Sequence, residues 1–449
     1  MHGNGTWWAE HAWLGGERNA GGVLIGVKDG TFSSVTPGVP VPPPGATTLR
    51  GITMPGLVNA HSHAFHRALR GRTHDARGTF WSWRDTMYRA AEALDPDLYL
   101  RLARAVFAEM VLAGYTTVGE FHYLHHDPLG RPYSDPNQMG SALLGAASEA
   151  GIRITLIDAC YLSGGFGETA LEGVQRRFSD TDVSCWAERV ASLKTGDGQR
   201  MAAAVHSVRA VPPGAIKHLA AYAAQSGWPL HAHVSEQRAE VDDCMAATGL
   251  SPFQLLETAG ALDCDFTAVH ATHAGPHDVV VLGDSRAHVC ACPTTERDLG
   301  DGIGPFARMR DVGVQLCLGS DSHAVIDGFE EARALEMDSR LVSEQRVLFS
   351  SSELIRAATS AGLESLGWSA GGLAPGQPAD FVSIRTDTPR TAGCDPELAA
   401  STIFGASAAD VDTVVVGGDT IVDGGEHTRI ENPAAAIAAA VDEVWAWHR

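Results

Sequence analysis

The sequence predicts an α/β fold, in which a TIM-like (β/α)8 barrel of eight parallel strands lies beside a small β-sandwich domain built from both chain ends. From residue 54 onwards, short apolar runs alternate with segments of helical periodicity, which is typical of a parallel sheet covered on both faces. Short strands punctuated by Gly and Pro stand at both ends of the chain, which favours a separate β unit. The length of 449 residues accommodates both, since such a barrel takes about 250 residues or more.

The two ends of the chain share one pattern. Residues 1–53 show no βα unit and read as short strands, with 21–27 the clearest and a Pro-rich turn at 40–44. The pattern returns in 373–384 and 411–422. We therefore expect three parts: a small β domain over 1–53 plus 370–425, the barrel over 54–369, and a C-terminal helical tail over 426–449.

The barrel strands are expected at the apolar runs, because a strand buried on both faces shows little polar alternation. They are, in order, a strand from 57, then 115–121, 152–158, 201–205, 229–234, 266–270, 287–292 and 314–319. After the first strand we expect a long loop that contains Trp81, Trp83 and Arg84, and a further loop follows residue 292.

Helices are expected between these strands, where apolar residues recur at helical spacing. Their ranges are 96–112, 138–149, 184–193, 212–225, helices within 236–259, 276–283, 329–345 and 351–365. Gly151 and Gly227 are placed to end two of them. A last helix over 433–447 presents Val441, Val444 and Trp445 as a docking stripe.

The charged residues of the chain limit the kinds of partner that it can bind. The net charge of −21 argues against nucleic acid or an anionic membrane, because the long-range field would repel both. The only lysines are Lys28, Lys194 and Lys217, so nearly all positive charge is guanidinium, which suits bidentate carboxylate binding. An anionic small molecule would therefore be met by local arginines.

The cysteines indicate a reducing compartment. The eight of them are scattered without a CxxC motif, and Cys290 and Cys292 alternate in a buried strand where packing is the expected role. The N-terminus lacks a basic region followed by an apolar core, and no apolar run of about 18 residues occurs. We therefore expect a cytoplasmic protein with no membrane span.

Polar residues collect where the barrel strands end, which is where such barrels place their active sites. The first strand ends in His61-Ser62-His63, and alternate strand residues point to one side, so both imidazoles are aimed at one place. Other strand ends carry His206, His233, His270 and Asp321. This accumulation predicts a metal centre.

A set of three histidines and one aspartate suits zinc or another borderline divalent ion. The expected ligands are His61, His63, His233 and Asp321. We prefer His233 to His231 because it lies nearer the strand's carboxyl end and three residues before Glu236. We prefer His270 to His273 for a role in the site because His270 closes a strand.

One ion is expected rather than two, because none of the three lysines stands at a strand end to bridge a second ion as a carbamate. The ion would lower the pKa of its water to about 7. Asp321 can take the proton of that water, Glu236 can protonate a departing nitrogen, and His270 can orient the water or the tetrahedral centre. The pattern thus predicts hydrolysis.

These residues resemble the motifs of the amidohydrolase superfamily, whose members are metal-dependent hydrolase barrels. The matching segments are 55–63, His233-x-x-Glu236, His270, Ser320-Asp321 and 372–380. They span nearly the whole chain and specify the superfamily better than the substrate.

Longer strings resemble the family of formimidoylglutamate deiminases, which convert N-formimidoyl-L-glutamate to N-formyl-L-glutamate and ammonia in histidine degradation. The strings are 80–84, 114–123, 206–211, 235–237 with 240–244, 292–296 and 299–302. The resemblance implies a homodimer, with the same four metal ligands and with catalysis by Glu236 and His270. The implied substrate contacts are Arg84, Tyr123, His206 and Arg209, together with His66, where the family has glutamine.

The substrate class agrees with the charge pattern, because a glutamyl dicarboxylate needs fixed positive charge inside an acidic protein, which Arg84 and Arg209 can supply. Two alternatives stay open. Trp81 and Trp83 can form a slot for guanine or another heterocyclic amidine. The chain can also be a catalytically silent scaffold. The presence of all the candidate metal ligands argues against this alternative.

Overall fold

A computed structural model describes residues 3–74, 78, 80–167, 169–369 and 371–447, and it confirms the predicted fold class. Eight strands form one sheet in sequence order, and each described neighbouring pair is parallel. The strands are β5 (Leu57–Ser62), β6 (Tyr115–His122), β7 (Arg153–Cys160), β8 (Gln199–Ser207), β9 (Leu230–Val234), β10 (Phe266–His270), β11 (His288–Ala291) and β12 (Gln315–Leu318).

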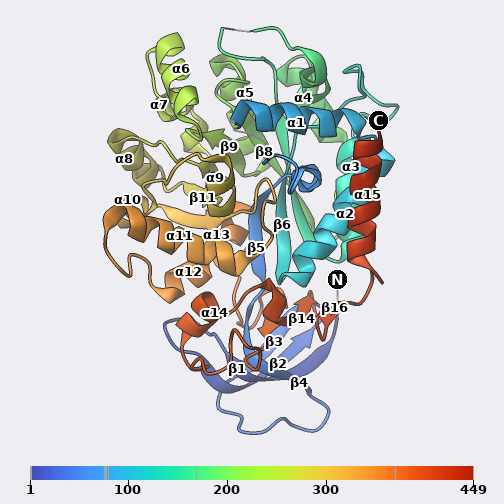
Figure 1. The fold of residues 1–449 in the computed structure, drawn as a ribbon, viewed down its shortest axis with the longest axis vertical. Helices are drawn as coiled ribbons and strands as arrows, with labels where there is room; N and C mark the ends of the chain where they lie inside the picture. The colour runs from blue at the N-terminus through green and yellow to red at the C-terminus, as the bar shows by residue number, and fades with distance from the viewer. Residues whose placement is uncertain (1–2, 75–77, 79, 168, 370, 448–449) are drawn as a thin grey trace.

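The first and last strands meet and bring the sheet round into a nearly closed barrel (Figure 1). Ser62 and Asp321 form an isolated parallel bridge. The amide of Asp321 donates to the carbonyl of His61 at 3.0 Å, and the amide of His63 donates to the carbonyl of Asp321 at 3.2 Å. The barrel seam therefore runs directly through residues proposed as metal ligands.

Helices cover the outside of the barrel. They are α1 (Phe80–Ala93), α2 (Pro96–Leu112), α3 (Gln138–Ala150), α4 (Val183–Ser192), α5 (Pro213–Ser226), α6 (Arg238–Thr248), α7 (Pro252–Thr258), α8 (Pro276–Ser285), α9 (Pro293–Leu299), α10 (Phe306–Asp311), α11 (Gly328–Ser343), α12 (Ser351–Ala357) and α13 (Ser360–Ser365). Gly151 and Gly227 adopt left-handed φ angles of +77° and +65° at the ends of α3 and α5, as predicted. Across the described residues, no helix combines the length and apolar character that a membrane crossing needs.

Two expected loops are helical. Residues 80–93, predicted as a loop, form α1, whose inner face buries Met87, Ala90, Ala91 and Ala93 at helical spacing. The aromatic residues at its start obscured this period. The loop predicted after residue 292 contains α9, which Pro293 begins and Gly300 ends. Arg84 therefore stands on a helix rather than in a loop.

Strands from both chain ends form the second sheet, as predicted, below the barrel in Figure 1. Its order is β16-β15-β14-β13-β4-β1-β2-β3. The strands are β1 (Gly5–Ala12), β2 (Ala20–Lys28), β3 (Thr31–Thr36), β4 (Thr47–Pro55), β13 (Phe381–Ile384), β14 (Val411–Val416), β15 (Asp419–Asp423) and β16 (Glu426–His427). The two ends meet where β13 pairs antiparallel with β4, around a core that includes Trp7, Ile25, Phe32 and Phe381.

A buried ion pair joins this sheet to the barrel. Arg153, at the start of β7, donates to Asp380, just before β13, with Nε to Oδ2 at 2.6 Å and Nη2 to Oδ1 at 3.1 Å. Asp380 also accepts from the amide of Gly417 at 2.6 Å. Because β7 begins at Arg153, the second sheet lies at the amino ends of the barrel strands. Their carboxyl ends remain free for a site.

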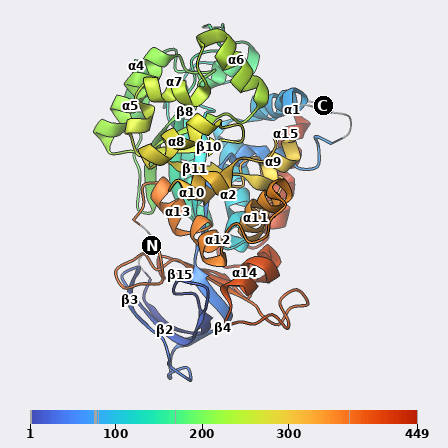
Figure 2. The same cartoon turned by 90° about the vertical axis from the view of Figure 1, so that its left-hand side faces the viewer.

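The C-terminal helix α15 (Pro433–Ala446) packs against α2 and α1 (Figures 1 and 2). Val444 is fully buried there, with Val441 and Trp445 partly buried against the barrel's core cluster. The indole nitrogen of Trp445 donates to the carbonyl of Ala68 at 2.9 Å. The expected docking stripe thus contacts the segment that follows β5.

Candidate metal centre and active site

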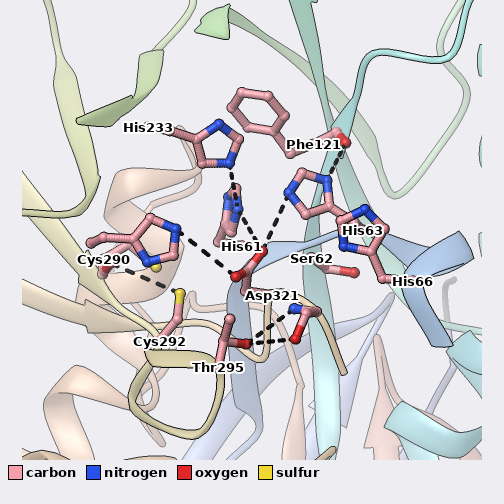
Figure 3. A network of polar contacts seen from close by, with 12 residues as sticks. His61, Ser62, His63, His66, Phe121, His233, Cys290, Cys292, Thr295 and Asp321 are labelled. Carbon is pink, nitrogen blue, oxygen red and sulfur yellow. Dashed lines mark hydrogen bonds and ion pairs between the residues drawn. The ribbon is translucent and has the colours of Figure 1, made fainter. Parts of the chain in front are cut away.

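The side chains predicted as metal ligands converge at the carboxyl ends of the barrel strands (Figure 3). His61 Nε2 and His63 Nε2 each lie 3.3 Å from Asp321 Oδ1. His233 Nε2 lies 3.1 Å from His61 Nε2. Residues from β5, from β9 and from the turn after β12, distant in the sequence, therefore meet at one place.

Hydrogen bonds to backbone carbonyls fix the tautomers of two of these histidines. His63 Nδ1 donates to the carbonyl of Phe121 at 3.0 Å, and His233 Nδ1 donates to the carbonyl of His206 at 2.8 Å. Burial lowers the pKa of His63 and of His233 well below the ordinary value, and it also lowers the pKa of His61. The neutral rings of His63 and His233 therefore aim Nε2 lone pairs inward, as metal-binding imidazoles do.

The donor set fits a divalent cation. Two neutral imidazole nitrogens facing each other at 3.1 Å repel unless a proton or a cation lies between them, and the Asp321 carboxylate lies beside both. Neutral imidazoles with one carboxylate are the ligands that zinc takes in catalytic sites. His61, His233, His270 and Asp321 all offer donor atoms within 4.8 Å of one another, and so do His63, His66 and Asp321.

His270 lies at the edge of this centre, between three carboxylates. Its Nε2 is 3.9 Å from Glu236 Oε1 and 3.9 Å from Asp321 Oδ2, while its Nδ1 is 3.4 Å from Glu296 Oε1. Burial alone would lower the pKa of His270, but these carboxylates outweigh it and raise the pKa to about 10. In the protein without a bound cation, His270 is therefore protonated.

Glu236 follows β9 and faces the pocket, with 16% of its side chain exposed. Burial raises its pKa above the usual carboxyl range, and the Asp321 and Glu296 charges add to that effect, against the opposing influence of His270. A carboxyl group whose pKa is raised takes up a proton more readily than a solvated one, which suits a proton donor.

Glu296 belongs to the site although the sequence reading gave it no role. It is 3% exposed, and its Oε1 accepts from the amide of Cys292 at 2.9 Å as well as facing His270. The sequence feature that could have identified Glu296 is a glutamate soon after an apolar strand. It lies within the segment wrongly expected to be a loop. Glu296 fixes the orientation of the His270 ring.

The backbone is strained where the site residues stand. Ser235, His270 and Asp321 adopt positive φ angles of +52°, +69° and +41°, which non-glycine residues rarely take and which cost about 1–3 kcal/mol each. Ser235 directly follows β9, His270 closes β10, and Asp321 stands in the turn three residues after β12. Such strain persists where the surrounding structure enforces it, and it is typical of functional sites.

A pocket opens above the centre. All five residues predicted as substrate contacts line it: His66, Arg84, Tyr123, His206 and Arg209. Aromatic side chains form much of its lining, including Trp81 and Trp83 on α1 and the contacting pair Tyr161 and Phe178. The polar part of its lining includes residues of the centre and four others: His63, His233, Glu236, His270 and Asp321, with Ser207, Gln237, Glu240 and Asp243.

Within the part of the chain that the structure describes, neither arginine of the pocket forms an ion pair with a carboxylate, although the charge of Arg209 acts on Glu236 and Glu240. Arg84 stacks on Trp81 and Tyr88, at 4.3 and 5.3 Å from the ring centroids. Arg209 Nη1 donates to the carbonyl of Gly164 at 3.5 Å, and the guanidinium also hydrogen-bonds the side chain of Tyr161. Structural salt bridges therefore do not account for these two side chains, and both can receive an anionic ligand.

His66 is held by Tyr123, whose hydroxyl lies 2.9 Å from His66 Nε2. Burial lowers the pKa of His66 to about 3, so the ring is neutral. Its Nδ1 is buried without a partner among the described atoms.

His231 was not expected to be a ligand, and it points into the core, where it donates to the carbonyl of Ser365 at 2.9 Å.

Several known proteins are similar to this chain in sequence. Residues 52–421 match the model of the Amidohydrolase family. Formimidoylglutamate deiminase of Pseudomonas aeruginosa is 37% identical over 430 residues, covering 93% of this chain and 94% of that protein. The 8-oxoguanine deaminase of the same organism is 28% identical over 386 residues, or 84% and 83% of the two chains.

Solved structures give the same result. The crystal structure of an amidohydrolase from Brucella melitensis superposes with a TM-score of 0.89 at 31% identity, covering 98% of this chain and 99% of that one. A zinc-bound adenosine deaminase from Xanthomonas campestris shares the fold, with a TM-score of 0.83 at 21% identity and 98% coverage of both chains. The family match over most of the chain, the barrel and the convergent His and Asp side chains show that this protein is a member of the amidohydrolase family.

Proposed function

We propose that the protein hydrolyses N-formimidoyl-L-glutamate. Water adds its oxygen to the formimidoyl carbon, the bond from that carbon to its terminal nitrogen breaks, and N-formyl-L-glutamate and ammonia are released. The observation that carries the proposal is the pair of guanidiniums, Arg84 and Arg209, which line the same pocket as the His and Asp centre and form no ion pair with a carboxylate among the described residues. The likeness to a formimidoylglutamate deiminase over 93% of the chain supports it.

We propose one divalent ion, Zn²⁺, held by His61, His63, His233 and Asp321. The distances among these four side chains and the tautomers of His63 and His233 support the assignment. A zinc-bound relative of the same fold is consistent with it. When bound, such an ion lowers the pKa of a coordinated water toward about 7 and so supplies a nucleophile at neutral pH.

The proton transfers belong to the chain's own carboxylates. Asp321, at the centre, can accept the proton that the attacking water loses. Glu236, whose pKa burial raises, can deliver a proton to the departing nitrogen, which then leaves as ammonia. His270, oriented by Glu296, can donate a hydrogen bond to the oxygen of the tetrahedral centre.

The remaining pocket residues bind the glutamyl part. Arg84 and Arg209 can each receive a carboxylate, and guanidinium groups suit this role because their donors match the two carboxylate oxygens. Tyr123, His206 and His66 line the same pocket and can make further contacts with the substrate. We also infer, from the family resemblance and the eight free cysteines, a cytoplasmic homodimer that acts on a small molecule, with neither nucleic acid nor membrane as partner.

A second candidate is an aminohydrolase that acts on guanine or another heterocyclic amidine. The aromatic walls formed by Trp81 and Trp83 favour it, as does the likeness to an 8-oxoguanine deaminase. The arginines argue for the first candidate, because a neutral purine gives two guanidiniums no anionic partner.

Ammonia release from four compounds separates the candidates: N-formimidoyl-L-glutamate, N-formimidoyl-L-aspartate, N-formimidoylglycine and guanine. We expect turnover of the glutamate compound, weaker turnover of the aspartate analogue, whose carboxylates lie closer together, and least of the glycine analogue, which has one carboxylate. Turnover of guanine alone would support the second candidate. Equal turnover of the glycine and glutamate compounds would contradict the assignment of both arginines to carboxylates.

A further inference from the structure

Polar side chains cross the barrel seam beneath the metal centre. Backbone pairing between β5 and β12 is sparse, with one isolated bridge at Ser62 and Asp321. Five side chains supplement it, and we call them the seam network: Asn59, Ser62, Glu120, Ser320 and His323. All five are fully buried.

The hydrogen bonds of the seam network run in one direction. Asn59 Nδ2 donates to Ser320 Oγ at 2.7 Å, and Ser320 Oγ donates to His323 Nδ1 at 2.9 Å. His323 Nε2 then donates to Ser62 Oγ at 3.2 Å, and Ser62 Oγ donates to Glu120 Oε2 at 2.6 Å. Each hydroxyl thus accepts one hydrogen bond and donates one, so no polar atom along this path is left unpaired.

One end of the seam network holds the residues on both sides of His63. Glu120 accepts from Ser62 Oγ through Oε2, and from the amide of Ala64 through Oε1 at 2.6 Å. The next residue of β6, Phe121, accepts from His63 Nδ1. Neighbouring residues of β6 therefore hold the backbone before and after His63, and also its ring.

The other end of the network encloses Asp321. Ser320 precedes it and is fixed by Asn59 through two bonds, since the Ser320 amide also donates to Asn59 Oδ1 at 2.9 Å. His323 follows Asp321 by two residues and, like Asp321, has a positive φ, of +59° against +41°. The strained turn that presents the Asp321 carboxylate is thus tied to β5 by side chains.

We propose that the seam network is a positioning device for the metal centre, which holds His63 and Asp321 at coordination distance from opposite edges of the barrel seam. None of the five residues lines the substrate pocket, so they are positioning residues rather than catalytic ones. The inference rests on the proposed metal site. Outer hydrogen-bond partners of metal ligands typically contribute 10–100-fold to metal affinity.

The test measures zinc affinity of the full-length protein by competition with a chelator. Ser62→Ala, the smallest change, removes the link between His323 and Glu120 and is expected to weaken Zn²⁺ binding about 10-fold; Glu120→Ala also frees the Ala64 amide and should weaken it up to about 100-fold. Glu120→Gln keeps an acceptor for Ala64 but cannot accept from Ser62, so its affinity should fall between wild type and Glu120→Ala.

A matched control is Glu336→Gln. Glu336 is an equally buried carboxylate that accepts from the amide of Phe349 at 2.8 Å, but it lies on α11, outside the barrel. It should bind zinc as wild type does, even if its melting temperature falls. Because Ser62 and Glu120 act in one path, Ser62→Ala combined with Glu120→Ala should lose little more affinity than Glu120→Ala alone.

The outcomes are distinct. Zinc affinities of Ser62→Ala and Glu120→Gln within twofold of wild type would overturn the seam network as a positioning device, while leaving the proposed deiminase intact. If Glu120→Ala does not fold, the other two variants still decide. A wild-type protein that binds no zinc would overturn the proposed function together with this inference.

Discussion

The Glu236→Gln variant is expected to release ammonia from N-formimidoyl-L-glutamate about a thousand times more slowly than wild type, since general acid catalysis contributes about 10²–10⁴-fold. The amide has nearly the shape of the carboxylic acid but cannot deliver its proton to the departing nitrogen. Because Glu236 is outside the proposed ligand set, zinc content should not change, and KM should change little. Steady-state kinetics with metal analysis of the same preparation measures all three quantities.

Glu257→Gln is the matched control, because Glu257 lies exposed on α7, on the outside of the barrel, and should leave kcat unaltered. A Glu236→Gln variant with at least a tenth of wild-type kcat would remove Glu236 as the proton donor. Loss of zinc along with activity would instead place Glu236 among the residues that hold the ion.

The Arg209→Ala variant is expected to raise KM for N-formimidoyl-L-glutamate by about 100-fold, or ~3 kcal/mol, the usual loss when one partner of a buried charged hydrogen bond is removed. The carboxylate it received would be left in a partly buried pocket without its partner. The effect should fall mainly on KM, because the carboxylates do not change during the reaction and bind ground state and transition state alike.

Arg209→Lys separates charge from geometry. It keeps the positive charge but loses the two-pronged donor, so its KM should lie between those of wild type and Arg209→Ala. Arg308→Ala, an exposed arginine on α10, should have wild-type KM. An unchanged KM for Arg209→Ala would remove Arg209 from the substrate site.

The fold was predictable where hydrophobic pattern determines it. The apolar run ending at His270 predicts β10, and the observed strand Phe266–His270 has the same bounds. Helix α2 begins and ends where its spacing predicts, with Asp95 capping its first turn. The pattern failed at α1, where an aromatic cluster at the start of the helix masks the periodicity of residues that pack inward.

The candidate site likewise contains residues that the sequence pattern identifies and residues that it does not. His61, His63, His233 and Asp321 could be selected because each stands at a strand end, and a barrel brings strand ends together. The sequence marks Glu296 only as a glutamate that follows an apolar strand, and it does not reveal the roles of Glu296 and Glu120, because these depend on which side chains they contact. Those contacts are set by the register between strands and by strained turns, such as the one at Asp321, that local sequence does not reveal.

The central claim is that a single divalent ion at His61, His63, His233 and Asp321 enables the hydrolysis of N-formimidoyl-L-glutamate. The most direct test is to strip the purified protein of metal with a chelator and follow ammonia release as Zn²⁺ is added back. The account predicts no activity without metal and full recovery at one equivalent per chain, with no recovery for His233→Ala at the same zinc concentration. Full activity in the metal-free protein, or recovery that needs two ions per chain, would contradict it.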